Sequence, residues 1–182
     1  MRALVATPAR RGAVIIVVLC VAAVAWYLGS PLFIRTTANE AFPTAAPVQP
    51  VSGSSAATGA SGGTATPTSV APTPRTIATG TLSFVDGQHN GTGSVLLIRT
   101  GDTSVLRFEN VAITNAPDVH VYLSPETGGK WSGPTSLYLG PLKATNGSFN
   151  YPVPTDADLS RYKSVVVWCR QFAVLVTWAD LR

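Results

Sequence analysis

One cysteine, Cys169 in the stretch VVVWCRQF at residues 165–172, is the first candidate for chemistry in this sequence. The only other cysteine, Cys20, lies in an apolar N-terminal stretch, where we interpret it as a membrane-helix residue. A cysteine without a partner in an exported protein is either protected in the core or reactive. Reactivity requires the thiolate, which a nearby positive charge stabilises. Arg170 could supply this charge only if the chain turns directly after Cys169, because in a continuing strand it would lie on the opposite face. The pattern alone leaves both core packing and a redox thiol open.

Two histidines extend the candidate chemistry, because His89, His120 and Cys169 are just enough ligands in number for a copper centre. Haem ligation would draw on the same residues, although no C-x-x-C-H motif for covalent haem attachment occurs. We therefore treat Cys169 and His120 as candidate cofactor ligands for a cofactor that stays unknown, with haem or copper possible. His89 lies beside Asn90-Gly91, which is typical of a polar turn, and no dedicated metal site is expected.

The sequence holds no recognisable enzyme motif. It contains neither a G-x-S-x-G nucleophile elbow nor a glycine-rich phosphate loop between a strand and a helix. Two N-x-[ST] triplets, at Asn90 and Asn146, fit glycan acceptors but also fit Asn-Gly turns. This pattern favours a non-catalytic module over an enzyme.

The net charge of +4 is concentrated at the N-terminal side of the chain. From Thr76 onward, eight Lys and Arg residues balance eight Asp and Glu residues. A neutral globular part offers no basic surface for phosphate groups, so we expect no nucleic-acid partner.

Residues 12–34 form an uncharged apolar stretch that is long enough to cross a bilayer. Arg10 and Arg11 precede it, and this basic side predicts a cytoplasmic N-terminus (residues 1–11) with an extracytoplasmic C-terminal part. A cleaved signal peptide, with Ala23–Ala25 as the cleavage site, is the rival interpretation. We favour an uncleaved anchor that makes the chain a single-pass membrane protein.

Residues 35–75 are dominated by Thr, Ala, Pro, Ser and Gly and carry almost no charge. Such a composition cannot bury enough apolar surface to offset the entropy of ordering the backbone. We expect a disordered linker that spans roughly 35 Å as a flexible coil.

Residues 76–182 consist of short segments rich in β-branched and aromatic residues, bounded by Gly, Pro, Asn or Asp. The segments lie at 76–84, 93–100, 103–111, 118–124, 136–142, 148–153, 164–169 and 172–178. About eight short strands at regular spacing predict an all-β domain, an antiparallel β-sandwich.

Strand alternation predicts which side chains share a face. In residues 118–124, His120 and Tyr122 face away from the valines, together with Asp118. In residues 164–169, Cys169 shares a face with Val165 and Val167, opposite Val166 and Trp168. In residues 172–178, alternation groups Phe172, Val174, Val176 and Trp178.

Three stretches of residues 78–182 stand out: PDVHVYLS at 117–124, YLGPLKATNGSFNYPVP at 138–154 and YKSVVVWCRQFAVLVTWADL at 162–181. Together they resemble the DM-thirteen family of electron-transfer domains, which is often found beside DOMON domains. The family's elements match at Pro117, Asp118, Val121, Tyr122, Leu123, Leu139, Gly140, Leu142, Lys143, Gly147, Tyr151, Pro154, Trp168, Cys169, Phe172, Ala179 and Leu181. The resemblance implies a β-sandwich whose cysteine, here Cys169, acts as a redox thiol or holds a prosthetic group such as haem.

The leading hypothesis is therefore a membrane-tethered, extracytoplasmic electron-transfer module with Cys169 as its redox thiol or ligand. Its redox partner is unknown, and its contact with the membrane would be the N-terminal helix. The alternative is a cell-surface binding or adhesion sandwich in which Cys169 is core packing. In that alternative Trp131 and Tyr138, in the loop GGKWSGPTSLY, are the contact residues.

Overall fold

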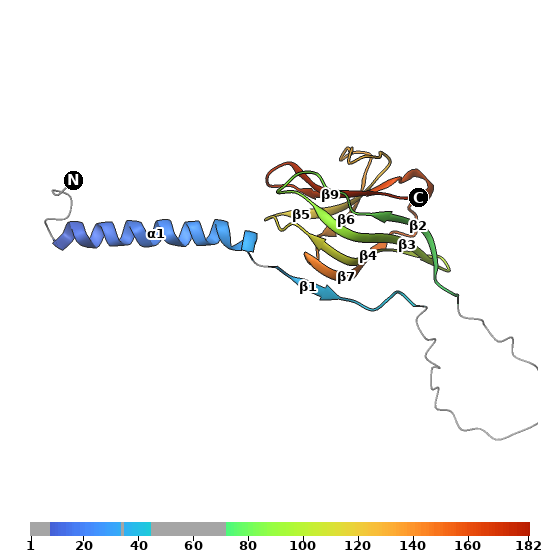
Figure 1. Cartoon of the computed structure of the whole chain (residues 1–182), viewed down its shortest axis with the longest axis horizontal. Coiled ribbons are helices and arrows are strands. Elements are labelled where there is room, and N and C mark those ends of the chain that lie inside the picture. The colour runs from blue at the N-terminus through green and yellow to red at the C-terminus, as the bar shows by residue number, and fades with distance from the viewer. Residues whose placement is uncertain (1–7, 34, 45–71) are drawn as a thin grey trace, which may run out of the picture.

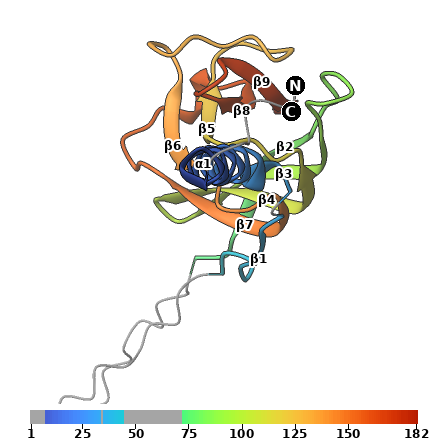
Figure 2. The ribbon, with the colours of Figure 1, turned by 90° about the vertical axis from the view of Figure 1, so that its left-hand side faces the viewer.

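The structure, a computed structural model, describes residues 8–33, 35–44 and 72–182, and it is mostly β. Nine strands form two sheets that pack face to face, as Figure 2 shows with one sheet above the other. The five-stranded sheet has the order β1-β7-β4-β3-β2, and the four-stranded sheet has the order β6-β5-β8-β9. The predicted antiparallel sandwich is confirmed, although one strand pair is parallel.

The strand bounds agree with the predicted segments at most positions. They are β1 Thr37–Asn39, β2 Arg75–Thr81, β3 Gly91–Thr100, β4 Thr103–Ile113, β5 Val119–Ser124, β6 Leu137–Pro141, β7 Asn146–Val153, β8 Ser164–Cys169 and β9 Val174–Asp180. One short 3-10 turn, Leu159–Arg161, precedes β8.

The core lies between the two sheets, where alternating residues of each strand meet. Val119, Val121 and Leu123 of β5 lie there with Val165, Val167 and Cys169 of β8, as alternation predicts. Phe108 and Phe149 of the opposite sheet stack with their ring centroids 5.1 Å apart. The two central strands of the smaller sheet therefore have one face in this core and a second face that points away from it.

The last predicted strand begins two residues later than expected. Residues 170–173 form a turn, so Phe172 is exposed, and Ala173 has a positive φ of 51°. A register shift between Val167 and Trp168 then adds a residue to β9. The bulge places Trp178 on the outer face, opposite Val166, and corrects the predicted grouping of Trp178 with Val174 and Val176.

The start of the predicted linker is a docked strand. Thr37–Asn39 form β1, which pairs in parallel with β7, Thr37 opposite Asn146 and Asn39 opposite Ser148. The Glu40 amide continues the pairing and donates to the Ser148 carbonyl at 2.7 Å. The expectation of disorder was wrong for these residues, because backbone hydrogen bonds to a sheet edge need no apolar pattern. Residues 45–71 of the predicted linker lie outside the described residues.

The helix α1 runs from Pro8 to Phe33 and extends away from the sandwich (Figure 1). Within the described residues, no helix is both long and apolar enough to cross a membrane. The transmembrane anchor expected over residues 12–34 is therefore not found.

Candidate functional site

Cys169 is the last residue of β8, and its side chain is fully buried at 0% exposure. It lies on the inner face of the smaller sheet, where it pairs with Val119 of β5 and Val174 of β9. Both described cysteines, Cys169 and Cys20, are free. Because the thiol has no exposed surface, it cannot contact the disulfide or the cofactor of a partner while the core stays closed.

The chain does turn directly after Cys169, but the Arg170 side chain does not lie beside the thiol and does not stabilise its thiolate. Its backbone N–H donates to the Asp118 carbonyl at 2.8 Å, which holds the turn against β5. Its guanidinium Nε donates to the Tyr122 hydroxyl at 2.7 Å on the opposite, outer face of the sheet. The positive charge of Arg170 therefore belongs to a cluster of aromatic side chains.

His120 and Cys169 lie on opposite faces of the sheet, because His120 pairs with Trp168 and Cys169 pairs with Val119. Both ring nitrogens of His120 are engaged, Nδ1 with the Tyr138 hydroxyl at 2.9 Å and Nε2 with Asp118 Oδ1 at 2.6 Å. Neither nitrogen is left to ligate a cofactor together with Cys169.

His89 lies in the turn before β3, as its Asn-Gly neighbours predict. Its Nδ1 lies 2.8 Å from Asp86 Oδ2, and this hydrogen bond holds the pKa of the Asp86 carboxyl below its ordinary value. Among the described residues no group of three His, Cys, Asp or Glu side chains could hold a metal ion. His89, His120 and Cys169 therefore do not converge on a copper site. A haem iron has no access to Cys169 while the core is closed.

The structure instead brings together a cluster of side chains on the outer face of the smaller sheet. We call it the outer aromatic cluster, and it consists of Asp118, His120, Tyr122, Trp131, Tyr138, Trp168 and Arg170. Its rings are in continuous contact. The centroids lie 4.9 Å apart for Trp168 and Trp131, 4.6 Å for Trp131 and Tyr122, and 5.3 Å for Tyr122 and Tyr138. The ring contacts run from Trp168, the residue before Cys169, to Tyr138, which is 43% exposed.

Strand pairing positions most of this cluster. Tyr122 of β5 pairs with Tyr138 of β6, and a bulge between Val121 and Tyr122 lets the Tyr138 hydroxyl reach His120. The guanidinium carbon of Arg170 lies 4.5 Å from the centre of the Tyr138 ring, a cation–π contact that covers the ring.

The loop at residues 125–136 supplies Trp131. The Ser164 hydroxyl donates to the Glu126 carbonyl at 2.6 Å, and the Ser124 hydroxyl donates to the Lys130 carbonyl at 3.2 Å. Gly129, with φ at +76°, lies so close to the outer face that a Cβ would meet Leu175 at 2.7 Å. These contacts fold the loop back over the sheet and insert Trp131 between Tyr122 and Trp168.

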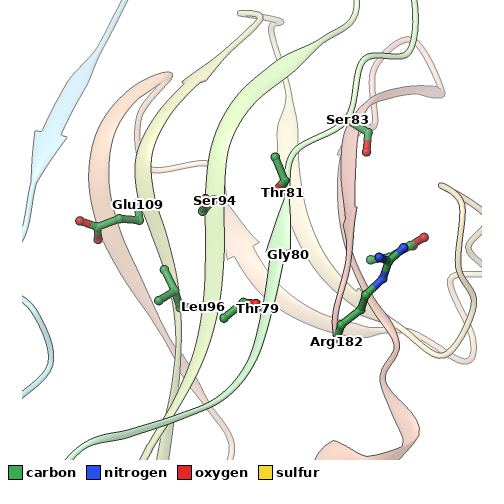
Figure 3. Close-up of a pocket in the computed structure, with 9 residues that line it drawn as sticks. Thr79, Gly80, Thr81, Ser83, Ser94, Leu96, Glu109 and Arg182 are labelled. Atoms are coloured by element: carbon green, nitrogen blue, oxygen red, sulfur yellow. The ribbon is translucent and has the colours of Figure 1, made fainter.

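A cavity of about 590 Å³ lies elsewhere, at the edge of the five-stranded sheet (Figure 3). Hydroxyl and charged side chains line it together with Leu96, and they include Thr79, Ser94, Glu109, Asp180 and Arg182. It contains neither Cys169 nor a member of the outer aromatic cluster, so size alone does not make it the site.

A family model described as Electron transfer DM13 matches residues 83–181, which include every member of the outer aromatic cluster and Cys169. The chain belongs to the DM13 family. Membership supports a general role in electron transfer for the sandwich and confirms the resemblance seen in the sequence. No curated protein and no solved structure matches the chain.

Proposed function

We propose that this DM13 protein is a membrane-tethered, extracytoplasmic electron-transfer module whose electrons enter and leave through the outer aromatic cluster. Besides Cys and Met, Tyr and Trp are the side chains that lose an electron most readily. Rings in van der Waals contact couple well enough to pass an electron from one to the next.

The observation that carries this proposal is the unbroken ring series from Trp168 through Trp131 and Tyr122 to the exposed Tyr138. A partner that docks on this face would meet Tyr138 directly. A partner that needed Cys169 would first have to open the core, since its side chain is 0% exposed. Cys169 then contributes packing behind the cluster, and an electron that reached it would pass through Trp168.

The tether is supported by α1, whose apolar side chains are exposed along the described stretch. They are Val14, Ile15, Ile16, Val17, Val18, Leu19, Val21 and Val24, followed by Trp26 and Tyr27. Arg10 and Arg11 precede this stretch, which favours a cytoplasmic N-terminus. Protease added to intact cells should reach the sandwich; protection until lysis would reverse the proposed orientation.

One observation favours the second candidate, an adhesion module, because Tyr138 is exposed beside a half-buried Trp131. The Trp131 ring, however, packs against Tyr122 and Trp168 and does not project from the loop. If the protein is an adhesion module, Trp131→Leu should abolish its attachment to cell surfaces and leave its rate of oxidation unchanged.

The test of the electron-transfer proposal uses the full chain in detergent with hexachloroiridate(IV), a one-electron oxidant, in excess. All proteins compared also carry Trp26→Phe and Tyr27→Phe, because these exposed side chains of α1 would react directly with the oxidant. Tyr138 loses the first electron directly, and the measured quantity is the rate at which the electrons that follow it are lost. We expect Trp131→Leu to lower this rate, because it interrupts the ring series at its centre. Trp178→Leu is the matched control, since Trp178 lies on the same outer face outside the series. Equal rates in wild type and Trp131→Leu would overturn the proposed route.

A further inference from the structure

We infer that Tyr138 is a proton-coupled redox tyrosine, which gives its electron to an oxidised transition-metal complex and its phenol proton to His120. This inference rests on the proposed electron-transfer function and specifies the chemistry at the exposed end of the cluster. Three contacts carry it: Tyr138 to His120, His120 to Asp118, and Arg170 to the Tyr138 ring.

The hydrogen bonds fix the direction of the proton. An ionised carboxylate only accepts hydrogen bonds, so the His120 Nε2 that faces Asp118 Oδ1 at 2.6 Å carries the ring hydrogen. With the single ring hydrogen of a neutral imidazole on Nε2, Nδ1 is an acceptor, and the Tyr138 hydroxyl 2.9 Å away donates to it. Tyr138 thus has a base already in hydrogen-bond contact.

The charges favour loss of the electron and the proton together. The guanidinium of Arg170 lies over the Tyr138 ring, so a cationic ring would face a fixed positive charge at 4.5 Å. Loss of the proton avoids that cation. The new imidazolium is stabilised by the Asp118 carboxylate on its far side.

The step balances with one external reactant. The Tyr138 O–H bond breaks and a bond forms between that hydrogen and His120 Nδ1, while one electron passes to the metal complex, which is reduced. The products are a neutral phenoxyl radical and an imidazolium paired with Asp118. Re-reduction of the radical takes one electron from a one-electron donor, which is thereby oxidised; the ring series passes this electron to Tyr138, and the proton returns from His120 Nδ1 to the phenol.

The other tyrosines of the sandwich core and cluster lack such a base. The Tyr122 hydroxyl accepts from the Arg170 guanidinium, which cannot take up a proton. The Tyr151 hydroxyl donates to the Pro141 carbonyl at 2.9 Å, and burial raises the pKa of this phenol well above its ordinary value. Tyr138 is the member of this set with an imidazole acceptor and an exposed ring.

The test uses photogenerated tris-bipyridyl ruthenium(III) as oxidant on the full chain in detergent, with radicals identified by electron paramagnetic resonance. Wild type should give a tyrosyl radical that forms more slowly in D₂O. All proteins compared carry Trp26→Phe and Tyr27→Phe, because these exposed side chains of α1 would give radicals of their own. In this background Tyr138→Phe should lose the signal, while Tyr162→Phe, a half-buried tyrosine outside the cluster, should keep it. His120→Phe should slow radical formation at least about 100-fold and remove the isotope effect, since a positioned base is lost.

Because His120 is 8% exposed, its replacement can harm folding, so Asp118→Asn provides a second variant at a half-exposed side chain. It keeps the base and should reduce the radical yield without abolishing it. An unchanged signal in Tyr138→Phe, or a wild-type isotope effect in His120→Phe, would overturn the inference. A tryptophan radical without a tyrosyl radical would overturn this inference alone, whereas the absence of any radical in wild type would overturn the proposed function as well.

Discussion

The substitution Gly147→Ala should detach β1 from the sandwich. Gly147 lies in β7 opposite Ala38, with φ at +105°. A Cβ at this position would lie 2.1 Å from the Ala38 carbonyl oxygen, against 3.4 Å for an ordinary contact. The two backbones must therefore separate by about 1.3 Å, which is more than an N–H···O bond of 2.7–3.2 Å tolerates.

The matched control is Gly140→Ala, which carries the same kind of backbone strain without the clash. Gly140 has φ at +139°, and its added Cβ would meet only Tyr151, at 3.7 Å. In both variants the new alanine is held at a positive φ, and this strain should lower the free energy of unfolding by about 1–3 kcal/mol. Only Gly147→Ala should undock β1.

The assay is hydrogen exchange of the amides in residues 36–42, together with a circular dichroism spectrum to show that the sandwich persists. Glu40 is the most informative position, because its amide donates to the Ser148 carbonyl at 2.7 Å. In Gly147→Ala this amide should exchange like one in an unfolded peptide, while Gly140→Ala keeps its protection. If Glu40 stays protected in Gly147→Ala, the docking of β1 is not as described.

Three further predictions concern packing, pH and the linker. Cys169→Ser should cost on the order of 1–3 kcal/mol by burying an unpaired hydroxyl, more than Cys169→Ala, and wild-type Cys169 should alkylate only after denaturation. A hydrogen bond from Lys143 holds the pKa of the Glu40 carboxyl below its ordinary 4.5. The carboxylate therefore stabilises docked β1 fully above pH 4.5, and this stabilisation is lost as the pH falls through the lowered pKa. Hydrogen exchange of the β1 amides should become faster over that pH range in wild type, and Glu40→Gln should remove this pH dependence. Cleavage at a protease site inserted within residues 45–71 should leave the sandwich bound to α1 through β1, and prompt release would contradict this.

Most of the sandwich could be predicted because its strands alternate and are separated by turn residues. Alternation also placed His120 and Tyr122 on the face opposite Val119 and Val121, and Trp168 on the face opposite Cys169, as observed. Membrane crossing by α1 was predicted from the apolar run alone, and the described residues do not bear it out.

The docking of β1 could not be predicted from its sequence pattern. The residues TAN at 37–39 have no apolar alternation, and what holds them is backbone pairing with β7. Side chains far away in the sequence complete the contact, such as the Lys143 ammonium 2.8 Å from Glu40 Oε1 and the buried Arg107 that donates to the Glu40 carbonyl at 3.1 Å. A Glu in a stretch otherwise almost free of charge was the available signal.

The outer aromatic cluster was half predictable. Strand alternation predicted the faces of four members: Asp118, His120, Tyr122 and Trp168. Trp131 joins them from a loop whose path depends on hydrogen bonds from Ser124 and Ser164 to loop carbonyls. Cys169 is the lone cysteine of the sandwich, and alternation predicted its face but not its burial. Its full burial follows from the packing of the inner face of β8 against the five-stranded sheet.

In the proposed function, electrons travel through the outer aromatic cluster and not through the Cys169 thiol. One comparison decides between these routes. In the Trp26→Phe, Tyr27→Phe background, the rate at which hexachloroiridate(IV) removes the electrons that follow the first is measured with Cys169 and Trp131 intact, in Cys169→Ala and in Trp131→Leu. We predict that Cys169→Ala leaves this rate unchanged and that Trp131→Leu clearly lowers it. A lowered rate in Cys169→Ala beside an unchanged rate in Trp131→Leu would show that the electrons pass through the thiol.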